Sequence, residues 1–69
     1  MNPIKRKRLE HELTMGQLAE MAKIGKSTLS DIESNRHSPS VRIAISIADI
    51  LEVENLRELF PYDSEVSNN

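Results

Sequence analysis

Apolar side chains recur every three or four positions along most of the chain, which is the spacing of one face of an α-helix. The segments with this pattern are residues 3–11, 15–22, 26–33, 41–51 and 55–60. Each is short, and a helix of under three turns is marginal in isolation, so these helices must be stabilised by packing on one another. The pattern therefore predicts an all-α protein of five helices around a single core.

The length and composition limit this core and the surroundings of the chain. The 69 residues form one small domain at most, and the absence of cysteine excludes disulfides and thiolate metal sites. No apolar run approaches the roughly 18 residues of a membrane span, so we expect a soluble, cytoplasmic protein. Residues 61–69 are polar and without a pattern, and we expect them to form a disordered tail.

Residues that favour helix ends stand between the apolar segments. Thr14 followed three positions later by Gln17 is a capping-box pattern, in which each side chain accepts a hydrogen bond from the other residue's backbone. Gly25 and Ser40 are N-cap candidates for the segments that follow them. Asn35 tolerates the left-handed backbone conformation that ends many helices. These residues place the ends of the second, third and fourth helices.

The second and third helices meet the requirements of a helix-turn-helix, in which two short helices cross at a tight turn. The crossing needs small side chains, the turn needs an apolar plug, and the later helix needs buried positions three apart. The residues that supply these features are Ala19, Ala22, Ile24, Leu29 and Ile32. The opposite side of residues 26–33 is mostly hydroxyl-bearing or charged, and in this motif that side enters the major groove of DNA.

The candidate DNA contacts are polar side chains on this side and at both ends of the motif. They are Thr14, Gln17, Lys26, Ser27, Thr28, Ser30, Asp31 and Arg36. Lys26 can donate to guanine O6 and N7 or to a phosphate, or remain a solvated charge at the helix start. Ser27 and Ser30 can each donate or accept, so they suit several bases. Arg36, in the following loop, is the strongest candidate for a phosphate contact, and Arg42 is a weaker one.

Besides Lys26, three of these candidates have competing interpretations. Thr28 can offer its methyl group to thymine or its hydroxyl to a phosphate, or it can be partly buried against the preceding helix. Asp31 can accept from cytosine N4, or it can be a surface charge near Lys26 or Arg36. Gln17 can reach a phosphate or serve only as a capping partner.

Charge is distributed unevenly along the chain. The net charge is −2, but residues 1–42 carry eight basic and five acidic side chains, whereas residues 43–69 carry one basic and six acidic. We therefore expect residues 1–42 to contact a polyanion and the acidic residues 43–69 to face away from it. With one Phe and one Tyr, the chain offers little surface for stacking on single-stranded bases, so double-stranded DNA is expected from the helix-turn-helix and not from the aromatic content.

Over about residues 4–60 the chain resembles the Cro/repressor-type (Xre family) helix-turn-helix regulators of phages and bacteria. The resemblance is carried by the segments LTMGQLAEMAKIGKSTLSDIESNRHSPS and VRIAISIADILEVENLRELF. It implies a compact five-helix lambda-repressor-like DNA-binding domain and a structural ion pair between Arg8 and Glu33. Three positions depart from the family pattern: Met15 stands where a glutamine usually contacts a phosphate, Lys23 stands where the turn usually has glycine, and Asn35 stands where glycine is common.

A homodimer is expected, because one recognition helix contacts too few base pairs for high specificity. A two-fold axis would place two such helices on the half-sites of a palindromic operator, about one turn of DNA apart. The fourth helix has more apolar surface than one core needs. One stripe is Val41, Ala44, Ile45, Ala48 and Leu51, and a second is Ile43, Ile47 and Ile50.

The second stripe and one side of the fifth helix are therefore candidates for the dimer interface. These candidates are Ile43, Ile47, Ile50, Leu56, Leu59 and Phe60. Alternatively, residues 55–60 fold back and cover the stripe within one subunit, or they are shared between core and interface.

The main hypothesis is a sequence-specific transcriptional regulator, a repressor or a phage- or plasmid-type control protein. The alternative is a protein-interaction module, antitoxin-like or a co-regulator, with weak DNA binding of its own and a protein partner. The acidic balance, Met15 and Asp31 favour this alternative. His11 and His37 have no second ligand at metal spacing, and no nucleophile motif or glycine-rich loop is present. The sequence therefore indicates no metal, no cofactor and no catalytic residue.

Overall fold

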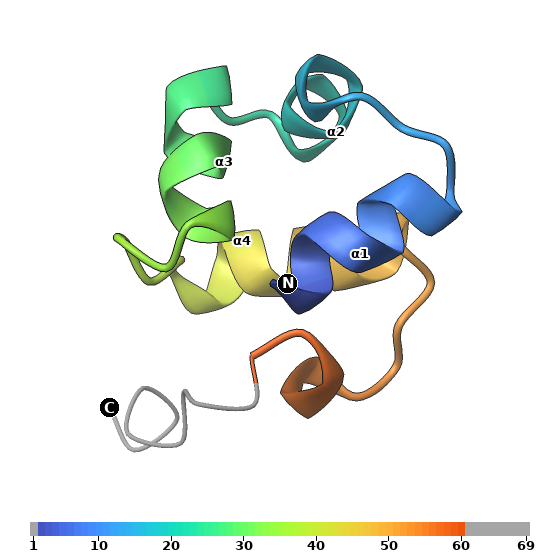
Figure 1. Cartoon of the computed structure of the whole chain (residues 1–69). Helices are drawn as coiled ribbons and strands as arrows, with labels where there is room; N and C mark the ends of the chain where they lie inside the picture. The colour runs from blue at the N-terminus through green and yellow to red at the C-terminus, as the bar shows by residue number, and fades with distance from the viewer. Residues whose placement is uncertain (1, 61–69) are drawn as a thin grey trace.

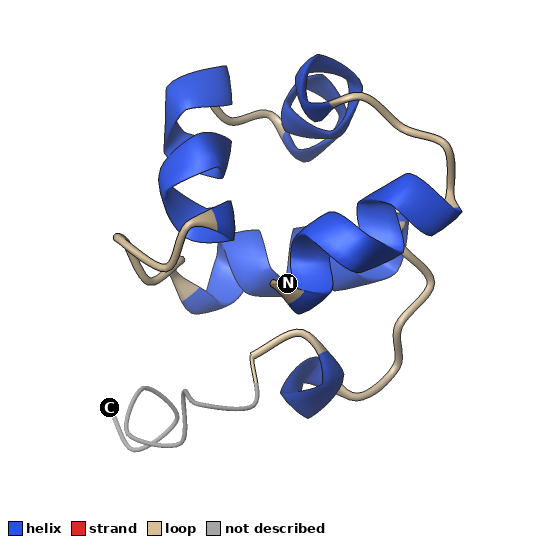
Figure 2. Ribbon diagram, in the orientation of Figure 1, coloured by secondary structure: helices blue, strands red, loops and turns tan. Residues whose placement is uncertain are grey.

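The computed structural model describes residues 2–60 as four α-helices and one short 3-10 helix (Figure 1). They are α1 (Pro3–Glu10), α2 (Met15–Ala22), α3 (Lys26–Glu33), α4 (Val41–Ile50) and the 3-10 helix η1 (Leu56–Glu58). No strand occurs within this range, so the all-α prediction is confirmed (Figure 2). No helix within it is both long and apolar enough to cross a bilayer. The polar tail predicted for residues 61–69 lies outside the described residues.

The core lies between the helices, with α4 packed against both α2 and η1, and α2 packed against α3. In Figure 1, α4 runs behind α1, with α2 and η1 on opposite sides of it. The largest fully buried side chains of the core are Ile4, Leu18, Leu29, Ile32, Ile47, Leu51 and Leu59. Burial of each such side chain stabilises the fold by about 1.5–3 kcal/mol. All four α-helices contribute to this core, and helices this short are marginal in isolation.

The apolar side chains of α4 are divided differently from the prediction. The buried positions at the helix and its end are Ala44, Ile47, Ala48 and Leu51. Val41 and Ile45, which belong to the first predicted stripe, are 60% and 47% exposed. Ile47, which belongs to the second stripe predicted for the dimer interface, is 0% exposed. The buried side of α4 is set by the direction from which α2 and η1 approach it, and the helical period alone does not contain that direction.

The fifth α-helix predicted for residues 55–60 is a single 3-10 turn. Asn55 caps it by accepting a hydrogen bond from the Arg57 backbone N–H at 2.9 Å. The N–H of Phe60 donates to the carbonyl of Leu56 at 2.9 Å, which closes the turn. The prediction of five α-helices is therefore replaced by four and a short turn.

The dimer-interface candidates are divided by this turn. Ile47, Leu59 and Phe60 are buried in the core of one chain, which is the fold-back arrangement considered as the alternative. Ile43, Ile50 and Leu56 pack against the core and keep part of their surface exposed.

The helix starts follow the local sequence signals closely. Thr14 Oγ1 accepts from the Gln17 N–H at 3.0 Å, and Gln17 Oε1 accepts from the Thr14 N–H at 2.8 Å, so the predicted capping box is present. Ser40 Oγ accepts from the Ile43 N–H at 3.2 Å and caps α4. The exception is α3, because its N-cap is Gly25 and no side chain caps it.

All four α-helices end in the same kind of turn. A residue in the left-handed conformation follows each helix: Glu12, Lys23, Asn35 and Glu52. The next N–H then donates to the carbonyl five positions before it, for example from Ile24 to Ala19 at 3.0 Å and from Val53 to Ala48 at 2.8 Å. This conformation disfavours most side chains by roughly 1–2 kcal/mol. Asparagine tolerates it, so three of the four turns carry local strain.

Candidate nucleic-acid interface

A buried ion pair joins α1 to the end of α3. Arg8 Nε donates to Glu33 Oε2 at 2.8 Å, and Arg8 Nη2 donates to Glu33 Oε1 at 3.2 Å. The third contact, from Arg8 Nη1 to the Leu13 carbonyl at 2.9 Å, was not foreseen from the sequence. Both charged residues are buried, so their hydrogen bonds must replace the water lost on folding. The pair therefore holds the C-terminal end of α3 in a defined position against α1.

Asn2 makes a second connection between the same two helices. Its Oδ1 accepts from the Ile4 N–H at 2.7 Å and caps α1, while its Nδ2 donates to Asn35 Oδ1 at 2.8 Å. Asn35 is the left-handed residue that ends α3. Sequence reasoning did not single out Asn2, although an asparagine directly before Pro3 is a common N-cap signal.

The outer side of α3 is open to solvent. Lys26, Ser27 and Ser30 are exposed, and Thr28 is half-buried, while Leu29 and Ile32 on the opposite side are in the core. Ser34, at the end of the same side, donates its hydroxyl to the Ser30 carbonyl at 2.9 Å. The arrangement leaves hydroxyl and ammonium groups near the start of α3 free to meet an external partner.

Asp31 and Arg36 lie close together at the end of this side. Arg36 Nη1 is 4.0 Å from Asp31 Oδ1, and the Arg36 side chain is 78% exposed. An ion pair this open to water contributes about 0–1 kcal/mol, so a stronger anion can displace it. The Arg36 backbone is nevertheless fixed, because its N–H donates to the Asp31 carbonyl at 2.8 Å. Of the two neighbours considered for Asp31, the structure places Arg36 beside it.

At the start of α2, the capping box occupies part of the predicted phosphate site. Gln17 Oε1 and Thr14 Oγ1 both accept backbone hydrogen bonds, so the Gln17 amide NH₂ and the Thr14 hydroxyl hydrogen are the side-chain donors left for a phosphate. Met15 is half-buried and packs against the core, so this departure from the family pattern has a structural role. Lys23 occupies the turn in the left-handed conformation, with a φ of 61°.

Basic side chains on α1 differ in their surroundings. Lys5 and Arg6 are exposed, and Lys7 Nζ lies 3.7 Å from Glu10 Oε1. Arg8 is buried in its ion pair with Glu33. Arg42, at the start of α4, is also exposed. Within residues 2–60, no three His, Asp or Glu side chains come together as a metal site would require.

The geometry is that of a helix-turn-helix, and a protein-family model described as helix-turn-helix matches residues 4–59. The chain belongs to this family, of the Xre/Cro type, which is a class of DNA-binding transcription regulators. No solved structure matches the chain.

A curated relative is the immunity repressor protein of Bacillus phage phi105, with 41% identity over 51 residues. The matched residues are 74% of this chain but 35% of the phage protein, so the chain spans about a third of that relative's length.

Proposed function

We propose that the chain is a sequence-specific repressor that reads the major groove of double-stranded DNA with the outer side of α3. The observation that carries this proposal is the exposed polar side of α3, held against α1 by the buried Arg8–Glu33 pair. A rigid position is needed because base-edge hydrogen bonds depend on the angle at which the helix enters the groove.

Each polar residue has a role set by its place on the motif. Lys26, Ser27 and Ser30 lie near the start of α3 and contact base edges, with Lys26 donating to guanine O6 and N7. Thr28 is half-buried, so it contributes a methyl or hydroxyl contact at the edge of the groove. Asp31 accepts from cytosine N4 once Arg36 turns to a phosphate.

Phosphate contacts flank these base contacts. Arg36 meets the DNA backbone after α3, and Thr14 and Gln17 meet it at the start of α2, where backbone N–H groups also favour an anion. Repression follows from occupancy of the operator, and it is supported by the similarity to the phage immunity repressor. Because the chain spans about a third of that relative, the repressor role is itself part of the proposal.

Two copies bind a palindromic operator in this proposal. Ile43 and Ile50, seven positions apart on one side of α4, are the remaining candidates with partly exposed apolar surface on that side. Sedimentation of the chain with a full operator should give two chains per duplex, and one chain with a half-site. A single chain on the full operator would contradict the dimer without affecting the reading of α3.

The test of DNA reading is selection of duplexes from a random pool, followed by titration of selected and shuffled duplexes at stated salt. Selected DNA should bind at least about 10³-fold more tightly. Lys26→Ala should relax the preference at one base pair by about 1–3 kcal/mol, whereas Arg36→Ala should weaken all duplexes alike and reduce the salt slope by about 1. Arg57→Ala, an exposed cation on η1, is the matched control and should change neither. Equal weakening of every duplex by Lys26→Ala would show that α3 does not read bases.

A further inference from the structure

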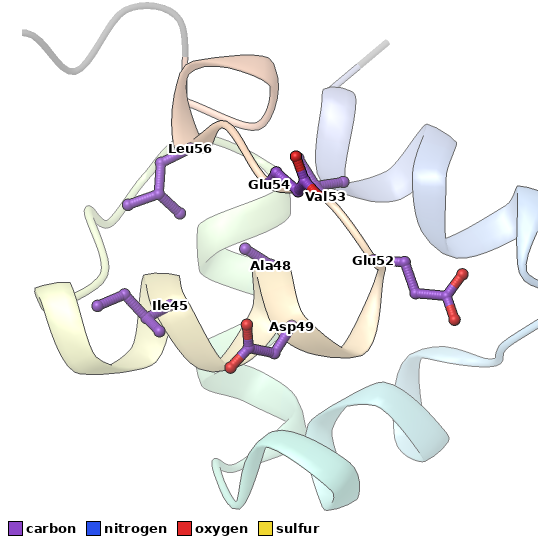
Figure 3. Close-up of a pocket in the computed structure, with 7 residues that line it drawn as sticks. All are labelled: Ile45, Ala48, Asp49, Glu52, Val53, Glu54 and Leu56. Atoms are coloured by element: carbon purple, nitrogen blue, oxygen red, sulfur yellow. The ribbon is translucent and has the colours of Figure 1, made fainter.

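A groove lies between α4 and the segment that leads into η1 (Figure 3). Its volume is about 490 Å³. Ala48 and Val53 are buried and form its base. Ile45, from α4, is 47% exposed, and Leu56, from η1, is half-buried. In Figure 3 the Leu56 side chain extends from η1 toward the side of α4 that carries Ile45. The groove therefore has an apolar strip, with Ile45 of α4 on one side and Leu56 of η1 on the other.

Three carboxylates also line the groove. Asp49, Glu52 and Glu54 line the groove and are exposed, and within residues 2–60 none of them takes part in an ion pair. Arg57 is the single basic residue from position 43 onward. Glu52 is held in place by its backbone, because its N–H donates to the Asp49 carbonyl at 3.2 Å. The groove is thus apolar at its base and negative at its rim.

A second copy of the chain does not suit this groove. A two-fold axis through it would bring the same three carboxylates of both copies together, and like charges at close range oppose association. A basic amphipathic helix suits it better, because apolar side chains three or four positions apart can follow the strip while lysine or arginine faces the rim. This is also why the dimer contact proposed above is placed on the Ile43 and Ile50 side of α4.

We propose that the groove between α4 and η1 docks a basic amphipathic helical segment of another protein. Ile45 and Leu56 contact the apolar side of that segment, and Asp49, Glu52 and Glu54 pair with its cations. In Figure 1, η1 lies on the opposite side of α4 from α2, so a segment in the groove leaves the start of the helix-turn-helix accessible. The docking site is therefore independent of DNA binding, and its failure would leave the proposed function standing.

The test uses two fluorescent synthetic peptides, each roughly 14 residues long with leucine at i, i+3, i+4 and i+7. One has lysine at the remaining positions and the other has glutamate, and anisotropy is measured with the full chain in the absence of DNA. The lysine peptide should bind at least about tenfold more tightly than the glutamate peptide, and more weakly as salt rises.

Variants then locate the peptide on the surface. Glu52→Gln combined with Glu54→Gln should weaken the lysine peptide roughly tenfold, at about two- to fivefold for each neutralised charge. Ile45→Ser should also weaken it by about tenfold or more. The matched controls lie on α2: Glu20→Gln is an exposed carboxylate, and Met21→Ser is an apolar side chain 52% exposed. Neither control should change binding. Thermal unfolding of every variant, followed by far-ultraviolet circular dichroism, verifies that the fold is kept.

Several results would overturn the proposal. They are equal affinity for the two peptides, no binding of either, or equal weakening by the α2 controls. Sedimentation equilibrium tests whether a second copy of the chain occupies the groove instead. A homodimer that Ile45→Ser dissociates would assign the groove to that second copy.

Discussion

Replacing Glu33 by glutamine should strongly destabilise the domain, because Arg8 would remain charged and buried without a counter-charge. The substitution keeps the size of the side chain, so packing changes little. One of the two Glu33 oxygens that accept from Arg8, at 2.8 and 3.2 Å, becomes an amide nitrogen that cannot accept. Arg8 keeps only one Glu33-side acceptor and its hydrogen bond to the Leu13 carbonyl at 2.9 Å.

The magnitude follows from burial. Removing one partner of a buried ion pair destabilises a protein by about 3–5 kcal/mol, whereas an exposed pair contributes about 0.2–1 kcal/mol. Arg8 and Glu33 are 6% and 7% exposed, so the larger value applies. Domains have about 0.05–0.15 kcal/mol of stability per residue, which for residues 2–60 is roughly 3–9 kcal/mol. Glu33→Gln therefore removes from about a third to all of the stability.

Urea unfolding followed by far-ultraviolet circular dichroism measures this loss. Arg8→Met, Glu33→Met and the variant with both substitutions form a double-mutant cycle, in which the double variant should lose less stability than the sum of the two single changes. Glu10→Gln is the control, because it breaks the exposed Lys7–Glu10 pair at 3.7 Å and should cost under about 1 kcal/mol. A loss below about 1 kcal/mol for Glu33→Gln, or strict additivity in the cycle, would refute the reasoning.

Three further predictions concern the free energy of unfolding, measured in the same way. Lys23→Gly should raise the free energy of unfolding by about 1 kcal/mol, because glycine tolerates the left-handed conformation of this turn. The control Glu54→Gly lies outside that conformation and should lower the free energy of unfolding, and a decrease with Lys23→Gly would contradict the turn geometry. Thr14→Ala should lower it by about 1 kcal/mol through loss of the capping box, and no change would argue against that cap. Ile47→Ala should lower the free energy of unfolding by about 2–5 kcal/mol, and Ile45→Ala should lower it by under about 0.5 kcal/mol. A larger loss for Ile45→Ala would show that the Ile45 side of α4, and not the Ile47 side, faces the core.

Features that depend on neighbours within about four residues could be predicted from the sequence. The capping box at Thr14 and Gln17, the left-handed residue Asn35 and the ranges of α2 and α3 all arise from such local interactions. The polar side of α3 is local in the same sense, because Leu29 and Ile32 define the opposite side by their spacing. The resemblance to the family added the pairing of Arg8 with Glu33, which is 25 positions away and has no local signal.

The sequence by itself therefore determined the four α-helices, most of their ends and the side of α3 that is exposed to solvent. The tertiary structure decided which residues of α4 are buried, because Ile45 and Ile47 are equally apolar and only the approach of α2 and η1 distinguishes them. It also shortened the fifth helix to one turn, and it brought the Leu13 carbonyl to Arg8 and Asn35 to Asn2. These contacts join residues whose partners are fixed by packing in space, and the helical period of the chain holds no information about that packing.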